Sequence, residues 1–152
     1  MCRVIINNDM VYSCGTDSTV TAWKVANDQL TYEFAHGGWV YDIVIGRDGT
    51  PLENRLVSIS ADGTCRLSNL ETGAKIIAHK FDGACRSIAV DKAQTLVAVG
   101  NGDKNLTFIE TTNYTKVKEV SLDCYVNSLA FNKRNDCLLA MTRDGWLHSL
   151  KF

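Results

Sequence analysis

The sequence predicts an all-β fold, a β-propeller assembled from four similar antiparallel sheets. Four stretches read as β-hairpins, because two alternating apolar runs flank a tight turn in each: 10–25, 56–70, 95–110 and 137–152. Asp-Gly turns such as Asp62-Gly63 suit a hairpin, since both residues tolerate positive φ angles. The turn aspartates recur at spacings of 45, 41 and 41 residues: Asp17, Asp62, Asp103 and Asp144. An all-strand repeat of that period is typical of propeller blades.

Each repeat is expected to contribute strands from the inside of a propeller to its rim, with turn residues Asn, Asp and Gly at the junctions. The blades extend over approximately 1–34, 35–80, 81–122 and 123–152. The first two are expected to hold strands at 3–6, 11–14, 19–25, 30–34, 40–45, 55–60, 65–70 and 74–79. The last two are expected to hold strands at 85–90, 96–100, 106–110, 116–122, 125–131, 138–142 and 146–152. Almost no helix is expected, because no window of eleven or more residues keeps apolar positions at the helical period.

The first hairpin resembles the signature of WD-repeat proteins. Its sequence SCGTDSTVTAWKV has small residues at the strand end, Asp17 in the turn and Trp23 six residues later. The segment FAHGGWVYDIVI is similar to the stretch that enters a WD blade, with His36 at the position of the family's histidine. The resemblance covers the whole chain and implies a propeller of WD-repeat blades. It implies no particular reaction, because the family shares an architecture rather than an activity.

The fourth repeat is expected to lack its outer strand. WD-repeat propellers resemble closed rings, usually of seven blades, so four blades at that curvature form an open arc with two apolar flanks and one unpaired edge. Such surfaces favour association. Three ways of covering them are open: a longer chain that supplies further blades, a second copy that closes a ring of eight, or another protein. A compact four-bladed ring is the alternative, but we expect closure by other polypeptide.

Composition limits the classes of partner. Over 152 residues the hydrophobic share is 45% and the net charge is −1, so neither direct nucleic-acid binding nor attraction to a membrane is expected. The apolar run at 4–6 is too short for a signal peptide or a membrane span. We therefore expect a cytoplasmic or nuclear protein without cofactor or metal. The cysteines lack Cys-x-x-Cys spacing and are expected to be reduced, with disulfides or metal ligation as alternatives: 2, 14, 65, 85, 124 and 137.

The resemblance also implies a network that locks each blade, made of a His, a Ser or Thr, the turn Asp and a Trp. A buried carboxylate needs such hydrogen-bonding partners. The set is incomplete in every repeat, with Ser68, Ile109 and Leu150 at the Trp position of the last three. The residues assigned to this structural role are His36, Ser58, Asp62, Asp17, Trp23, Asp103 and Asp144.

Ser58, His36 and Asp62 could alternatively be a hydrolase triad. No nucleophile elbow accompanies Ser58, and a serine at a strand end has no evident oxyanion hole. We therefore expect no catalytic residues and no enzyme.

Interaction with other protein chains is the function that the resemblance implies. WD propellers commonly receive partners on the face with the loops between blades and the first residues of each inner strand. Aromatic and arginine side chains suit such an interface. The corresponding residues are Trp39, Tyr41, Asp42, Arg86, Tyr125 and Asn127. Trp39 and Tyr125 could instead pack between blades.

The sequence therefore predicts a non-enzymatic protein-interaction scaffold. Two alternatives stay open: a structural propeller segment of a large ribonucleoprotein, coat or cytoskeletal assembly, and half of a homodimeric eight-bladed propeller. An enzyme that uses the propeller as a frame would need a convergent polar pocket.

Overall fold

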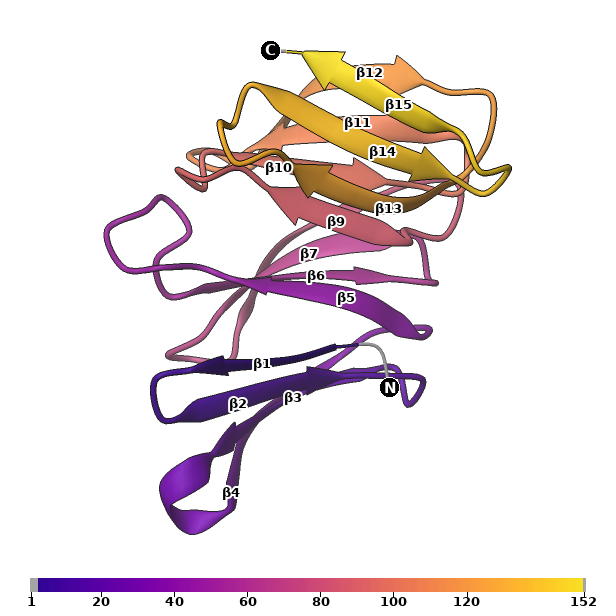
Figure 1. The fold of residues 1–152 in the computed structure, drawn as a ribbon. Helices are drawn as coiled ribbons and strands as arrows, with labels where there is room; N and C mark the ends of the chain where they lie inside the picture. Colours follow the sequence, from indigo (N-terminus) through magenta and orange to yellow (C-terminus); the bar gives the residue numbers. More distant parts are fainter. Residues whose placement is uncertain (1–2, 152) are drawn as a thin grey trace.

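A computed structural model describes residues 3–151, and β-strands make up nearly all of their regular structure (Figure 1). The first two repeats form β1 (Arg3–Asn7), β2 (Met10–Cys14), β3 (Thr19–Lys24), β4 (Gln29–Ala35), β5 (Val40–Ile45), β6 (Arg55–Ser60), β7 (Thr64–Asn69) and β8 (Lys75–Lys80). The last two form β9 (Ser87–Val90), β10 (Leu96–Gly100), β11 (Asn105–Glu110), β12 (Thr115–Ser121), β13 (Val126–Phe131), β14 (Cys137–Thr142) and β15 (Leu147–Lys151).

The strands form four separate antiparallel sheets, in each of which neighbours along the chain are neighbours in space. The orders are β1-β2-β3-β4, β5-β6-β7-β8, β9-β10-β11-β12 and β13-β14-β15. The turn between the second and third strand of each sheet places a left-handed residue directly after the turn aspartate. That residue has a φ of 67° at Ser18, 76° at Gly63, 66° at Lys104 and 89° at Gly145. The Asp-based turns therefore reverse the chain as the hairpin pattern predicts.

The sheets are stacked in chain order, from β1–β4 at one end to β13–β15 at the other (Figure 1). Consecutive inner strands β1, β5, β9 and β13 are in contact. Three apolar clusters fill the three spaces between consecutive sheets, and Ile43, Ile59 and Leu106 are fully buried representatives of them. Because side chains alternate across a strand, the two middle sheets are apolar on both faces.

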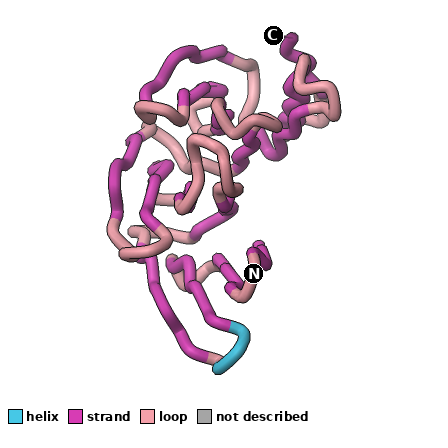
Figure 2. Tube along the Cα trace, turned by 90° about the vertical axis from the view of Figure 1, so that its left-hand side faces the viewer, coloured by secondary structure: helices cyan, strands magenta, loops and turns pink. Residues whose placement is uncertain are grey.

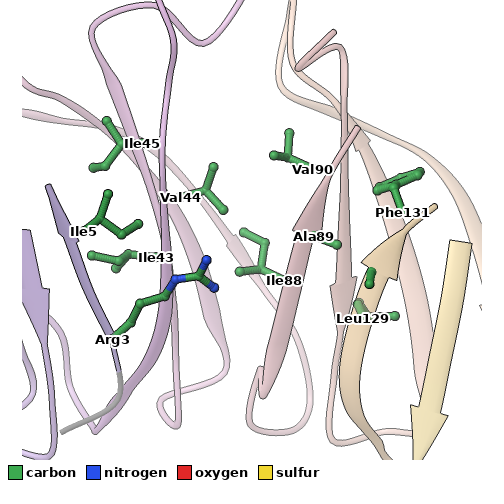
Figure 3. A pocket seen from close by; sticks show the side chains of 11 residues that line it. Arg3, Ile5, Ile43, Val44, Ile45, Ile88, Ala89, Val90, Leu129 and Phe131 are labelled. Atoms are coloured by element: carbon green, nitrogen blue, oxygen red, sulfur yellow. The ribbon is translucent and has the colours of Figure 1, made fainter. Parts of the chain in front are cut away.

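The inner strands also line a shared cavity of about 350 Å³ (Figure 3). Apolar side chains on its wall come from Ile5 of β1, Val44 of β5, Val90 of β9 and Phe131 of β13, and Arg3 of β1 also lines it. The outer strands β8 and β12 are by contrast mostly exposed, including Val117. The outer strands of the second and third sheets are thus much more exposed than the middle strands β6, β10 and β11.

The all-β prediction is confirmed, and all fifteen expected strands are present in the described part of the chain. Within residues 3–151 the fourth sheet has three strands, as expected. Several strand limits were predicted wrongly. Val25 lies in a single 3-10 turn, Val25–Asn27, which is the helical segment seen in Figure 2. Strand β9 begins at Ser87 rather than at residue 85, and the Cys85 N–H donates to Ser60 O of the preceding sheet (3.0 Å).

Further differences concern loops and termini. Trp146 precedes β15, and Cys124 lies in the bend before β13 rather than in a strand. Cys2 and the end of the last predicted strand at Phe152 lie outside the described residues. Among the cysteines of the described range, Cys65, Cys85, Cys124 and Cys137 are free thiols. Residues 3–151 form no helix long and apolar enough to cross a membrane.

Candidate protein-interaction surface

Backbone hydrogen bonds attach the starts of the inner strands β5 and β13 to turns that carry the repeated aspartates. Val40 N–H donates to Gly15 O of the first sheet (3.0 Å), and Ala61 N–H donates to Trp39 O (2.7 Å). In the fourth sheet, Arg143 N–H donates to Tyr125 O (2.9 Å). We call the surface formed by the turns 15–18, 61–63, 101–104 and 143–145 and the segments 36–39, 82–86 and 123–125 the turn face.

The second sheet and the segment that precedes it bring together His36, Ser58 and Asp62 at the turn face. His36 Nε2 lies 2.8 Å from Ser58 Oγ, and His36 Nδ1 lies 3.5 Å from Asp62 Oδ2. The Thr64 hydroxyl donates to Asp62 Oδ1 (2.6 Å) and lies 3.2 Å from His36 Nδ1. Arg66 Nη2 donates to Asp62 Oδ2 (2.8 Å). We call these five side chains the Asp62 network.

The network also holds the backbone around it. Gly37 N–H donates to Asp62 Oδ2 (2.8 Å), and Thr64 N–H donates to Asp62 Oδ1 (2.9 Å). Arg66 Nη1 donates to Ala35 O (2.5 Å). Asp62 therefore ties its own turn to the chain segment that connects the first sheet to the second.

Burial and charge fix the protonation states in this network. Burial, together with the nearby Arg66 charge, lowers the pKa of His36 from 6.5 to about 4, against the opposing pull of Asp62. Burial alone would raise the pKa of Asp62, but hydrogen bonds from Thr64 and Gly37 and the proximity of His36 hold it well below its ordinary value. At neutral pH, His36 is neutral and Asp62 is ionised.

The other three turns make simpler contacts. Asp17 accepts a hydrogen bond from Thr19 N–H (3.2 Å), and Asp103 accepts one from Asn105 N–H (3.2 Å). Asp144 accepts one from the Thr142 hydroxyl (2.6 Å), which lowers the Asp144 pKa. Trp23 lies at the end of β3 and is exposed. These residues are spread over three sheets, and none of them belongs to the Asp62 network.

Thr64 and Arg66 were missed by the sequence reasoning. Both follow Asp62 at alternate positions of β7, so a search for polar side chains on the same strand face as the turn aspartate would have found them.

A cluster of proposed partner residues lies at the turn-face end of β5 and β9. Trp39 is 53% exposed. The Arg86 guanidinium lies 5.5 Å from the centre of the Tyr41 ring, a cation–π geometry. Asp42 is less available, because Arg3 Nη1 of the first sheet donates to both of its carboxylate oxygens (2.9 and 3.1 Å). Burial raises the pKa of Asp42, with Arg3 opposing the shift.

Arg86 and Tyr125 line a second cavity, of about 260 Å³, on the turn face. Its other lining residues are Gly83, Ala84, Gly102 and Arg143. A Cβ on Gly83 would lie 2.6 Å from Gly102 backbone carbon, so glycine is required for this close approach of the loops. Asn127 is exposed on β13 but does not line this cavity. Arg86, Tyr125 and Arg143 therefore contribute to the lining of one cavity on the turn face.

The arrangement of Ser58 does not suit a nucleophile. Ser58 is 1% exposed, and the His36 side chain is 1% exposed. The cavity beside His36 is lined by neither Ser58 nor Asp62. The hydrogen bonds of these three side chains thus serve contacts inside the second sheet and its connection.

Comparison with known proteins gives a partial relative and a fold. No family model matches the chain. Cross-pathway control WD-repeat protein 2 of Flammulina velutipes is 34% identical over 74 residues, which is 45% of this chain and 22% of that protein. The part of the chain that matches therefore spans about a fifth of the length of this curated relative.

Two solved structures are similar over 98% of the chain, each with a TM-score of 0.83 and 18% identity. They are the computationally designed proteins Ika4 and Ika8, of which the match covers 89% and 45% respectively. At that identity the likeness concerns the fold alone. The chain is thus an all-β, propeller-like arc of four sheets that is similar, over part of its length, to a WD-repeat protein.

Proposed function

We propose that this chain is a non-enzymatic protein-interaction scaffold of WD-repeat type, which binds a partner protein on its turn face. The similarity to a WD-repeat protein supports the class of function. The observation that carries the location is the cluster of Trp39, the Tyr41–Arg86 pair and the cavity between Arg86 and Tyr125. Aromatic and arginine side chains are the commonest anchors of protein interfaces.

Rigidity of the turn face supports this function. The strand starts are hydrogen-bonded to the turns, and we propose that the Asp62 network locks the second sheet against the first. A surface that is ordered before binding loses less conformational entropy when the partner arrives. The loops can therefore present several contacts at once without rearrangement.

We propose no catalytic role for Ser58 or His36 at this surface. Ser58 and His36 are buried, and His36 bonds to both Ser58 and Thr64. We place the protein in the cytoplasm or nucleus, where free thiols such as those of Cys65 and Cys85 would stay reduced.

Substitution of the turn face tests the proposal. We expect Trp39→Ala and Arg86→Ala each to weaken binding of a purified partner at least tenfold, since central aromatic and arginine anchors typically contribute about 2 kcal/mol or more. Val117→Ala, on the exposed outer strand β12, is the matched control and should bind normally. Candidate partners are identified by affinity capture with the unmodified chain, and their affinities are then measured by calorimetry. Equal affinity of all three variants would refute the turn-face site.

A structural segment of a larger assembly is the second candidate. The apolar residues left exposed on the outermost sheets, such as Ile6 and Leu147, favour it. In that case the partner would cover those sheets, and Trp39→Ala would leave assembly unchanged.

A further inference from the structure

Both ends of the stack of sheets present a face that has no neighbouring sheet within the described residues. At one end, the face of β1–β3 that points away from the second sheet carries Val4, Ile6, Val11 and Trp23; we call it the first flank. At the other end, the face of β14–β15 that points away from the third sheet carries Leu139, Met141 and Leu147; we call it the fourth flank.

Equivalent positions in the other sheets are buried by the preceding sheet, so they show what kind of surface the first flank would pack against. Val4 pairs with Ser13 in the β1–β2 ladder, as Ile43 pairs with Ser58 in the second sheet. The corresponding residues of the third and fourth sheets are Ile88 and Leu129, which pair with Val99 and Ala140. Ile43, Ile88 and Leu129 are 0%, 4% and 8% exposed because the preceding sheet covers each of them, whereas Val4 is 48% exposed.

The fourth flank shows the complementary exception. The residue three positions after the turn aspartate is Val20, Cys65, Leu106 and Leu147 in the four sheets. The first three are fully buried against the following sheet, whereas Leu147 is 63% exposed. At each existing interface this position shares an apolar cluster with the inner-strand residue of the next sheet: Val20 with Ile43, Cys65 with Ile88 and Leu106 with Leu129.

By equivalence with the existing interfaces, the residue that would pack against Leu147 is therefore Val4.

The polar side chains on the two flanks form hydrogen bonds that would persist if the flanks were buried. The Ser13 and Thr21 hydroxyls lie 2.7 Å apart on the first flank, and Cys137 Sγ lies 3.0 Å from Ser149 Oγ on the fourth. Because each pair already forms a hydrogen bond within its own flank, covering these groups costs less than covering unbonded ones.

We propose that a second copy of this chain covers both flanks, so that the fourth flank of each copy packs on the first flank of the other and eight sheets close into a ring. A second copy is the occupant that carries both matching halves in the same geometry. The length is compatible with this arrangement, because the arc matches only 45% of the Ika8 chain, which leaves room there for a second arc of the same size. Two head-to-tail contacts related by a two-fold axis bury every flank and leave none free for further growth.

Single substitutions at the paired positions test the contact. We expect native mass spectrometry of the unmodified chain to give two-chain particles. Val4→Asp and Leu147→Lys should each give single chains, because each places a charge against an apolar partner. Val117→Asp, an equally exposed position on β12, is the control and should stay two-chain. Circular dichroism must show unchanged β-structure in all variants. A single-chain mass for the unmodified protein would overturn the proposal.

Mixing the two flank variants tests the head-to-tail arrangement. One mixed ring contains an unaltered contact and one contact in which Asp at position 4 faces Lys at position 147. We therefore expect the mixture, with one variant labelled with nitrogen-15, to recover mixed two-chain particles that neither variant forms alone. If like flanks met each other instead, each single variant would still pair through its unaltered flank, and that outcome would overturn the arrangement. Neither measurement involves the partner of the turn face, so it stands apart from the proposed function.

Discussion

At the residue scale, the Asp62 carboxylate is the centre of a hydrogen-bond network. Its two oxygens accept hydrogen bonds from Gly37, Thr64 and Arg66, and its neighbour His36 reaches Ser58. The sequence could suggest His36, Ser58 and Asp62 through a family resemblance. It could not show that Arg66 neutralises the carboxylate, because that contact depends on the pleat that puts positions 62 and 66 on one side. It also could not show that Asp17, Asp103 and Asp144 make far fewer contacts.

Titration of His36 should make folding stability depend on pH. The folded-state pKa of about 4 lies below the ordinary value of 6.5, so the unfolded chain binds the proton more tightly. The contribution of neutral His36 to the free energy of unfolding is fully present above pH 6.5 and is lost as the pH falls toward 4. The loss is on the order of 3 kcal/mol, since one pKa unit corresponds to about 1.4 kcal/mol.

Urea unfolding between pH 7.5 and 4.5 measures this effect. His36→Gln keeps hydrogen-bonding groups near Ser58 and Thr64 but cannot titrate, so its stability should vary much less over this window. His148→Gln, in the fourth sheet, is the control and should keep the slope of the unmodified chain. An equal slope in His36→Gln would show that other groups cause the pH dependence.

At the element scale, the strands could be predicted from alternation and turn residues, whereas contacts between sheets could not. The Cys85 N–H bonds to the preceding sheet before β9 begins, and sequence periodicity carries no sign of that bond. The Arg3–Asp42 pair joins β1 to β5 across 39 positions of sequence, and was likewise not predicted. The connection of β5 to β6 reads as a loop with the only proline, yet it buries Leu52 completely.

This loop gives a prediction for Gly46. Its N–H donates to Arg55 O (2.9 Å), and a Cβ at this position would lie 1.6 Å from Leu52 O. Gly46→Ala should therefore displace Leu52 from the cluster between the second and third sheets and lower the free energy of unfolding by about 1–3 kcal/mol. Gly15→Ala is the control, since its added Cβ would meet only Asp17 Oδ1 at 3.5 Å. Equal stability of the two variants in urea would show that the loop is not closely packed.

At the scale of the whole molecule, the period of the turn aspartates predicted four stacked sheets, and the resemblance to WD-repeat propellers implied an open arc with two apolar flanks. It was not enough to predict which side chains those flanks present. That required the strand registers, which align Val4 with Ile43 and Leu147 with Val20 and thereby show two halves of one repeated contact. Registers depend on turn geometry and bulges, such as the shift between Val40 and Asp42, that are not legible in the pattern of residues.

Sedimentation equilibrium of the unmodified chain over a range of concentrations tests this account most directly. The account predicts a single species of twice the 16.8 kDa chain mass, because two arcs bury all four flanks and then present no further apolar face. A mass of one chain at every concentration would contradict it, and so would a mass that keeps rising beyond two chains.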